Sequence, residues 1–164
     1  MTAGVTWGEL ARVRPDLADA GRGLLYQFGV GLAFLGTVRS DGGPRLHPVC
    51  PLLADEDLFA FVVPSAKRED LHRDGRYALH SFPCPDNEDA FYVTGQAFPV
   101  TDVARRARLG EQFAAERAEL SVPPPGETEE LFAFFVSRCL LTRTTGHGDP
   151  TPRHEVWTPG GGPV

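Results

Sequence analysis

The sequence predicts a mainly β fold (α+β), in which six or seven short antiparallel strands close into a small barrel with helices on its flanks. Two tight turns are the first observations that predict it. Ser40-Asp41-Gly42-Gly43 supplies the positive φ angles that a short hairpin requires, and the polar turn Ala54-Asp55-Glu56-Asp57 separates two apolar runs. The third observation is that apolar runs of strand length recur along the 164 residues, and closing such a sheet removes its exposed edges.

Helices are expected before the first strand and between later strands. Thr6-x-x-Glu9 matches a capping box that starts a short helix at Trp7, and Pro15 suits the first turn of a second helix. Together they predict an N-terminal helical cover over residues 1–29. Two later helices are predicted at Ser65–Arg73 and from Thr101 or Asp102 to about Leu120.

Seven segments have the alternation or the bulky apolar content of strands. They are Leu32–Val38, Arg45–Leu53, Leu58–Val63, Arg76–Phe82, Ala90–Val100, Phe132–Thr144 and His154–Trp157. Both faces of the first strand are apolar, which predicts burial on both sides. Pro48 and Pro51 have no amide hydrogen, so the second strand is expected to leave hydrogen-bonding positions open. Gly95 is expected to form a bulge in the fifth strand.

Composition restricts the class of protein. The length suits a single domain over residues 1–164, with residues 158–164 expected to fray. The net charge of −6 argues against a nucleic-acid partner, and no apolar run has the length of a membrane span. Cys50, Cys84 and Cys139 lack metal-ligand spacing, and the N-terminus does not resemble a secretory signal. These features predict reduced thiols, no metal site and a cytoplasmic location.

The start of the helix that follows the apolar run Leu58–Val63 is the strongest candidate for a binding site. Pro64 ends the strand, and Ser65 stands where the helix requires its N-cap. Lys67, the only lysine of the chain, and Arg68 follow directly. A helix start with a hydroxyl, free amides and two cations is suited to holding a phosphate group.

Three motifs in a fixed order resemble a known family. R-x-H-P-V spans Arg45–Val49, S-x-K spans Ser65–Lys67, and D-G-R-Y-A-L spans Asp74–Leu79. With the preceding hairpin, this order resembles the pyridoxamine 5′-phosphate oxidase-like split β-barrels that bind FMN. The resemblance covers Leu32 to about Val100, with a weaker echo in the terminal H-x-V-W. It implies a six- to seven-stranded antiparallel split β-barrel.

The resemblance also implies a homodimer that holds FMN at its interface and acts on a small molecule, with NAD(P)H as a candidate electron donor. It places Ser65 and Lys67 at the phosphate with Arg68 nearby, and Trp157 over the ring system from the partner chain. A cation at Arg45 would favour the anionic reduced form of the flavin. The full set of implied cofactor-binding residues is Arg45, Leu46, His47, Pro48, Val49, Phe61, Val62, Ser65, Lys67, Arg68 and Trp157.

The leading expectation is therefore an FMN-dependent oxidoreductase. The sequence departs from the family's pattern at one place, and it leaves several alternatives open. Arg153 and His154 do not match the spacing of the family's substrate-binding arginine and histidine, so the substrate and the catalytic residues stay unassigned. A deazaflavin-dependent reductase is an alternative, because Arg68 and Arg73 offer charge for a longer tail. A non-catalytic flavin- or haem-binding stress or sensor protein is another, with His147 and His154 as candidate haem ligands. A cofactor-free interaction module is the third.

Overall fold

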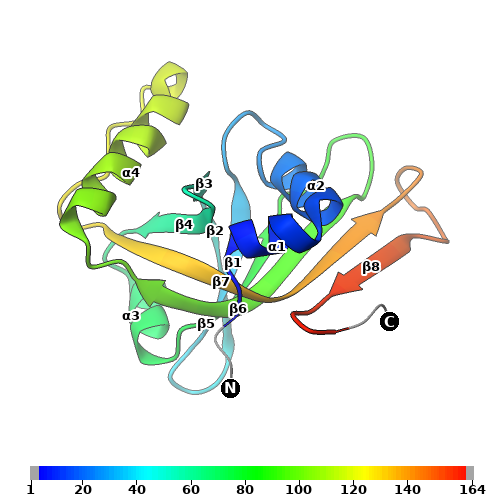
Figure 1. Cartoon of the computed structure of the whole chain (residues 1–164), viewed down its shortest axis with the longest axis horizontal. Coiled ribbons are helices and arrows are strands. Elements are labelled where there is room, and N and C mark those ends of the chain that lie inside the picture. Colours follow the sequence, from blue (N-terminus) through cyan, green and yellow to red (C-terminus); the bar gives the residue numbers. More distant parts are fainter. Residues whose placement is uncertain (1–3, 162–164) are drawn as a thin grey trace.

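The computed structural model describes residues 4–161, and its centre is an antiparallel sheet curled into a half-barrel (Figure 1). The strands are β1 (Ala33–Val38), β2 (Pro44–Val49), β3 (Pro51–Ala54), β4 (Asp57–Val62), β5 (Arg76–Ser81), β6 (Ala90–Pro99), β7 (Glu130–Arg143) and β8 (Arg153–Trp157). Their order is β2-β1-β5-β6-β7-β4-β3, and β8 pairs with β7. The predicted split β-barrel with flanking helices is confirmed.

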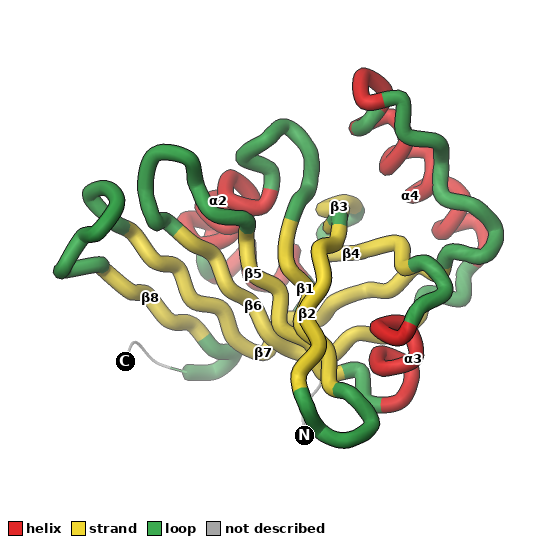
Figure 2. Tube along the Cα trace, turned by 180° about the vertical axis from the view of Figure 1, so that it is seen from behind, coloured by secondary structure: helices red, strands yellow, loops and turns green. Residues whose placement is uncertain are grey.

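Helices lie on two sides of this sheet. They are α1 (Trp7–Val13), α2 (Pro15–Leu25), α3 (Ala66–Arg73) and α4 (Val103–Glu116). The predicted capping box of α1 is present, because the Thr6 hydroxyl accepts from the Glu9 amide at 3.1 Å and the Glu9 carboxylate accepts from the Thr6 amide at 2.7 Å. Figure 2 shows α3 beside the β1–β2 end of the sheet and α4 standing apart from α2.

The strand predicted over residues 45–53 is interrupted, and this is a correction. β2 ends at Val49 and pairs with β1, whereas β3 begins at Pro51 and pairs with β4. Pro48 and Pro51 cannot donate to a ladder, so the chain leaves one part of the sheet at Cys50 and enters the other. β2 and β3 therefore end the sheet, and the expected closure without edges is wrong for the described chain.

The expectation that β1 is buried on both faces is also wrong within one chain. Ala33, Leu35 and Thr37 are buried, but Phe34 and Val38 on the other face are half-buried. The reason is that the helical cover lies on one face only, where α1 and α2 pack over β6 and β7. The second face of β1 is left partly open to solvent.

The core has two parts. The larger cluster joins the inner sheet face to α1 and α2, and includes Leu10, Leu25, Leu35, Phe91 and Phe132. The smaller cluster lies between β3, β4, β7 and α4, where the rings of Phe61 and Phe113 meet edge to face at 5.6 Å. The smaller cluster explains how α4 stays attached although it projects from the sheet (Figure 1).

Two places in the sheet have an irregular backbone. The β6–β7 register shifts between Thr94 and Gly95, which confirms the predicted bulge. A Cβ at Gly95 would lie 1.8 Å from the Phe135 carbonyl oxygen, so only glycine fits. In the β3–β4 turn, Asp55 and Glu56 have φ values of 47° and 63°, as a tight hairpin requires.

The chain ends beyond β8. Of the tail expected to fray, residues 162–164 lie outside the described residues, and the Gly161 amide donates to the Thr158 carbonyl at 3.1 Å. Within residues 4–161, none of the helices has the length and apolar content needed to cross a membrane.

Candidate functional site

The site is built on the first turn of α3. Ser65 is the N-cap in an extended conformation, but its hydroxyl donates to the Val63 carbonyl at 2.8 Å and does not cap the helix. The amides of Ala66 and Lys67 donate to no acceptor among the described residues. Free amides at a helix start attract anions, because the helix dipole is positive there.

Two of the predicted cations differ in how they are engaged. Arg68 donates from Nη1 to the Thr128 carbonyl at 2.7 Å, and its Nε lies 3.6 Å from the Glu130 carboxylate. Nε2 of His72 lies 2.6 Å from the other oxygen of Glu130. Lys67 is half-buried and forms no ion pair within residues 4–161. The ammonium of Lys67 is therefore the cation that remains available at this helix start.

A buried carboxylate joins α3 to the edge of the sheet. Asp70 is 3% exposed and accepts hydrogen bonds from Thr37 Oγ1 at 2.9 Å, Arg45 Nε at 2.7 Å and Arg73 Nη2 at 3.0 Å. Burial raises the pKa of Asp70, but the hydrogen bonds from Arg45, Arg73 and Thr37 outweigh it and hold this pKa below its usual range. Arg73 also donates to the Val38 carbonyl.

The lowered pKa of Asp70 predicts a specific acid sensitivity. A carboxyl whose folded-state pKa is depressed stabilises the fold above its unfolded pKa of about 3.9, and this contribution is lost as the pH falls through the folded value. We expect the free energy of unfolding, measured with urea, to be level above about pH 5 and to decline below about pH 4.

Two variants give this prediction its control. Asp70→Asn is expected to be less stable than the unmodified protein at neutral pH and to show a shallower decline in acid. Asp19→Asn changes an exposed carboxylate and is expected to leave the acid decline unchanged. An equally steep decline in Asp70→Asn and in the unmodified protein would contradict the assignment.

The predicted residues on β2 lie along the open edge of the sheet. Leu46 is 66% exposed, and His47 and Pro48 are also exposed. Val49 is buried in the main core, so only its backbone is available to a ligand. Arg45 is linked through Asp70 to α3, which brings this strand and the helix together. β2 can therefore offer unpaired backbone groups to a flat ligand.

The predicted residues on β4 face the interior of the protein. Val62 is fully buried, and Phe61 packs against Phe113 of α4. Their side chains support the fold, and only their main chain, which leads directly into Ser65, can contact a ligand.

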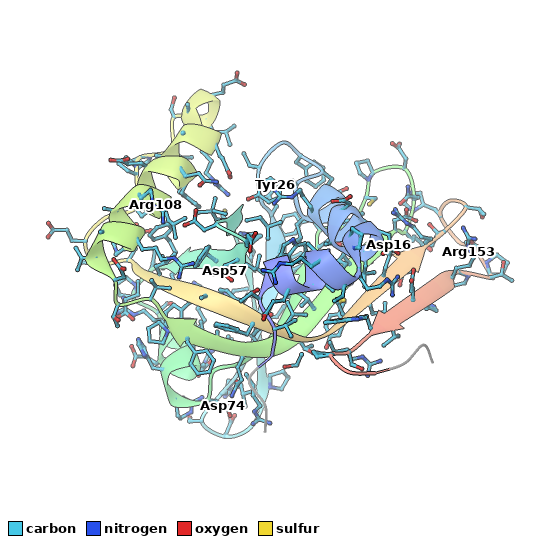
Figure 3. All side chains as sticks on the ribbon, viewed as in Figure 1. Asp16, Tyr26, Asp57, Asp74, Arg108 and Arg153 are labelled. Carbon is cyan, nitrogen blue, oxygen red and sulfur yellow. The ribbon has the colours of Figure 1, made fainter. Side chains whose placement is uncertain are left out.

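Trp157 lies away from α3 within one chain. It is opposite Cys139 on β7, whereas β4 pairs with β7 no further than Ala133, a separation of about 20 Å along the strand. Its ring packs partly buried against the chain's own core. Figure 3 shows Asp74, which follows α3, and Arg153, at the start of β8, in different parts of the molecule.

The two histidines considered as haem ligands make hydrogen bonds within the chain. His147 Nε2 lies 3.0 Å from the Pro85 carbonyl oxygen, and His154 Nδ1 lies 2.9 Å from Thr142 Oγ1. Among residues 4–161 no group of three or more His, Cys, Asp or Glu side chains is arranged to hold a metal ion.

Asp70 and Glu130 are the residues that the sequence interpretation missed. The spacing of Asp70 to Arg73, three residues apart on one helix, was an available signal for an ion pair. Nothing local marks Glu130, because its partners Arg68 and His72 are about 60 residues away in the sequence.

No family model and no curated protein matches this sequence. The fold, however, is similar to that of several solved structures. A haem-binding protein from Mycobacterium smegmatis has a TM-score of 0.62 and 17% identity over 85% of this chain and 57% of its own. PhzG from Burkholderia lata 383, solved in complex with tetrahydrophenazine-1-carboxylic acid, has a TM-score of 0.60 and 15% identity over 94% of this chain and 87% of its own.

A Clostridium acetobutylicum protein related to general stress protein 26, of the pyridoxinephosphate oxidase family, has a TM-score of 0.58 and 12% identity over 92% of this chain and 95% of its own. The chain thus has the split-barrel fold of the pyridoxamine 5′-phosphate oxidase-like proteins. At these identities the similarity defines the fold, and the function is argued from the residues of this chain.

Proposed function

We propose that this chain binds FMN between two copies of itself and acts as an FMN-dependent oxidoreductase on a small organic molecule. The observation that carries the proposal is the uncapped start of α3, with its free amides and the ammonium of Lys67, which has no ion pair within residues 4–161. The Ser65 hydroxyl joins them in this proposal by exchanging the Val63 carbonyl for a phosphate oxygen as its acceptor. A phosphate monoester is close to dianionic at neutral pH and requires such fixed donors. When bound, FMN supplies the hydride chemistry, and the protein supplies position and electrostatics.

The charges of the donor set support FMN as the ligand in this proposal. The first turn of α3 holds the phosphate in this proposal, with Ser65 and Lys67 as its side-chain ligands. Arg45 and His47 on the open edge of β2 then lie along the ribityl chain and the ring. The two terminal nitrogens of Arg45 donate to no group of the described chain, so they are free to bind a ligand.

A second copy of the chain completes the site in this proposal. The face of β1 that carries Phe34 is only half-buried, and Leu46 and Phe98 are 66% and 45% exposed. Covering this apolar surface favours association of two copies. The partner copy is the proposed source of Trp157 at the ring, since within one chain this side chain lies far along β7 from α3.

The engaged arginines favour FMN over a deazaflavin with a long anionic tail. Arg68 is bonded to the Thr128 carbonyl and lies close to the Glu130 carboxylate. Arg73 is bonded to Asp70. Among the described cations of α3, Lys67 is the one without an ion pair to a carboxylate, and one such cation suits one compact phosphate. The three cysteines are free thiols, which agrees with a reducing cytoplasm as the proposed location.

The visible absorption spectrum of the freshly purified protein tests this proposal. We expect flavin absorption bands, either as purified or after incubation with FMN and gel filtration, in a species of twice the chain mass. A Soret band would favour the haem-binding alternative, and a bound deazaflavin would favour the deazaflavin-dependent reductase. A colourless protein that retains no added FMN would contradict the proposed function.

A further inference from the structure

Asp70 is a carboxylate whose two oxygens are both engaged by cationic side chains. Oδ2 accepts from Arg45 at 2.7 Å and from Thr37 at 2.9 Å, and Oδ1 accepts from Arg73 at 3.0 Å. The side chain is 3% exposed, so it is screened from water and held from three elements, α3, β1 and β2. A carboxylate with this many fixed donors has little freedom to rotate.

The hydrogen bond between Asp70 and Arg45 determines how the Arg45 side chain is oriented at the edge of the sheet. The Nε–H of Arg45 is used by Asp70, and no acceptor among residues 4–161 takes its four other N–H groups. The side chain is 27% exposed and projects from β2, which has a neighbouring strand on one side only. Without Asp70 the long side chain would have several rotamers, and it would pay an entropic cost to adopt one of them at a ligand.

The contact also sets the local charge. Arg45 and Arg73 share one carboxylate, so the cluster carries a net charge of about +1 by the ordinary ionisation of these groups. Neutralising Asp70 would leave two cations without a counter-ion. A nearby cation without a counter-ion favours the reduced, anionic form of a bound flavin and so raises its midpoint potential.

We propose that Asp70 is a positioning residue that orients Arg45 toward the flavin and moderates its charge, an inference that rests on the proposed FMN site. Asp70 does not touch the cofactor. It acts through the Arg45 guanidinium, whose terminal nitrogens it leaves free and aligned. With the Asp70 carboxylate in place, the flavin midpoint potential is lower than it would be with Arg45 and no carboxylate beside it.

A double-mutant cycle on the flavin midpoint potential tests this inference. Asp70→Asn keeps the shape and one acceptor oxygen but removes the charge, and we expect the potential at pH 7 to rise. In an Arg45→Met background the same substitution is expected to raise the potential by clearly less, because Arg73 is then the only one of the two arginines that loses its counter-ion. Glu130→Gln is the matched control, because it removes a carboxylate beside Arg68, a cation placed at the phosphate end, and is expected to shift the potential less.

The outcomes separate the inference from the proposed function. An equal shift in both Arg45 backgrounds, or no shift in an Asp70→Asn variant that binds FMN, would overturn the role of Asp70 and leave the FMN site standing. An unmodified protein that binds no FMN would overturn both. If Asp70→Asn does not fold, Asp70→Asn/Arg73→Met removes one unpaired cation, and its potential compared with that of Arg73→Met is expected to show the same rise.

Discussion

Replacing both Ser65 and Lys67 with alanine is expected to weaken FMN binding about a hundredfold while leaving riboflavin binding unchanged. Riboflavin lacks the phosphate, so it does not use the first turn of α3. The Lys67 ammonium contributes about 1.5–3 kcal/mol through a charge-assisted hydrogen bond. The Ser65 hydroxyl contributes less, about 0.5–1.5 kcal/mol net, because it gives up its bond to the Val63 carbonyl, and together the two correspond to this loss. The free amides of Ala66 and Lys67 remain in the variant and account for residual binding.

Fluorescence-quenching titrations with the two flavins measure this effect. Glu69→Ala is the matched control, because Glu69 is an exposed neighbour in the same helical turn and its replacement leaves the proposed phosphate ligands intact. We expect Glu69→Ala to bind FMN at least as tightly as the unmodified protein. Equal losses for FMN and riboflavin in the double variant would show a general disturbance of the site and contradict the phosphate assignment.

The second large effect is expected in the core. Phe132 is fully buried on β7, opposite Ala60 of β4 and Pro99 of β6, and the His72 ring of α3 meets it edge-on at 5.2 Å. Phe132→Ala removes contacts to two strands and one helix and leaves a cavity. We expect the free energy of unfolding to fall by about 3–5 kcal/mol.

Chemical denaturation followed by circular dichroism measures this loss, with Phe28→Ala as the control. Phe28 lies in the turn after α2 and has the same side chain, but it is 47% exposed and is not part of the apolar surface proposed for the partner copy. Its replacement is expected to cost less than about 1.5 kcal/mol, since little buried surface is lost. Similar losses for the two variants would mean that the β4–β7–β6 contact is not a centre of stability.

Local signals explain why much of the fold could be predicted from the sequence. The capping box of Thr6 and Glu9, the glycine-containing β1–β2 turn and the bulge at Gly95 each depend on residues that are adjacent or on a backbone position that only glycine permits. The start of α3 at Ser65 was predicted for the same reason.

Long-range partners explain what could not be predicted. The kink at Cys50 requires that β2 and β3 pair with different strands, which no local pattern contains. Asp70 acquires Thr37 and Arg45 as partners, and Glu130 acquires Arg68, only when α3 docks against β1, β2 and β7. The sequence therefore indicated which cations could serve the site, but not which of them are already neutralised.

The ratio of the dissociation constants of riboflavin and FMN, measured on the unmodified protein by calorimetric titration, tests the central claim most directly. If the first turn of α3 holds the phosphate, FMN binds more tightly than riboflavin by more than about a hundredfold, because the free amides add to the contribution of the two side chains. Equal affinities for the two flavins, or no binding of either, would contradict the account.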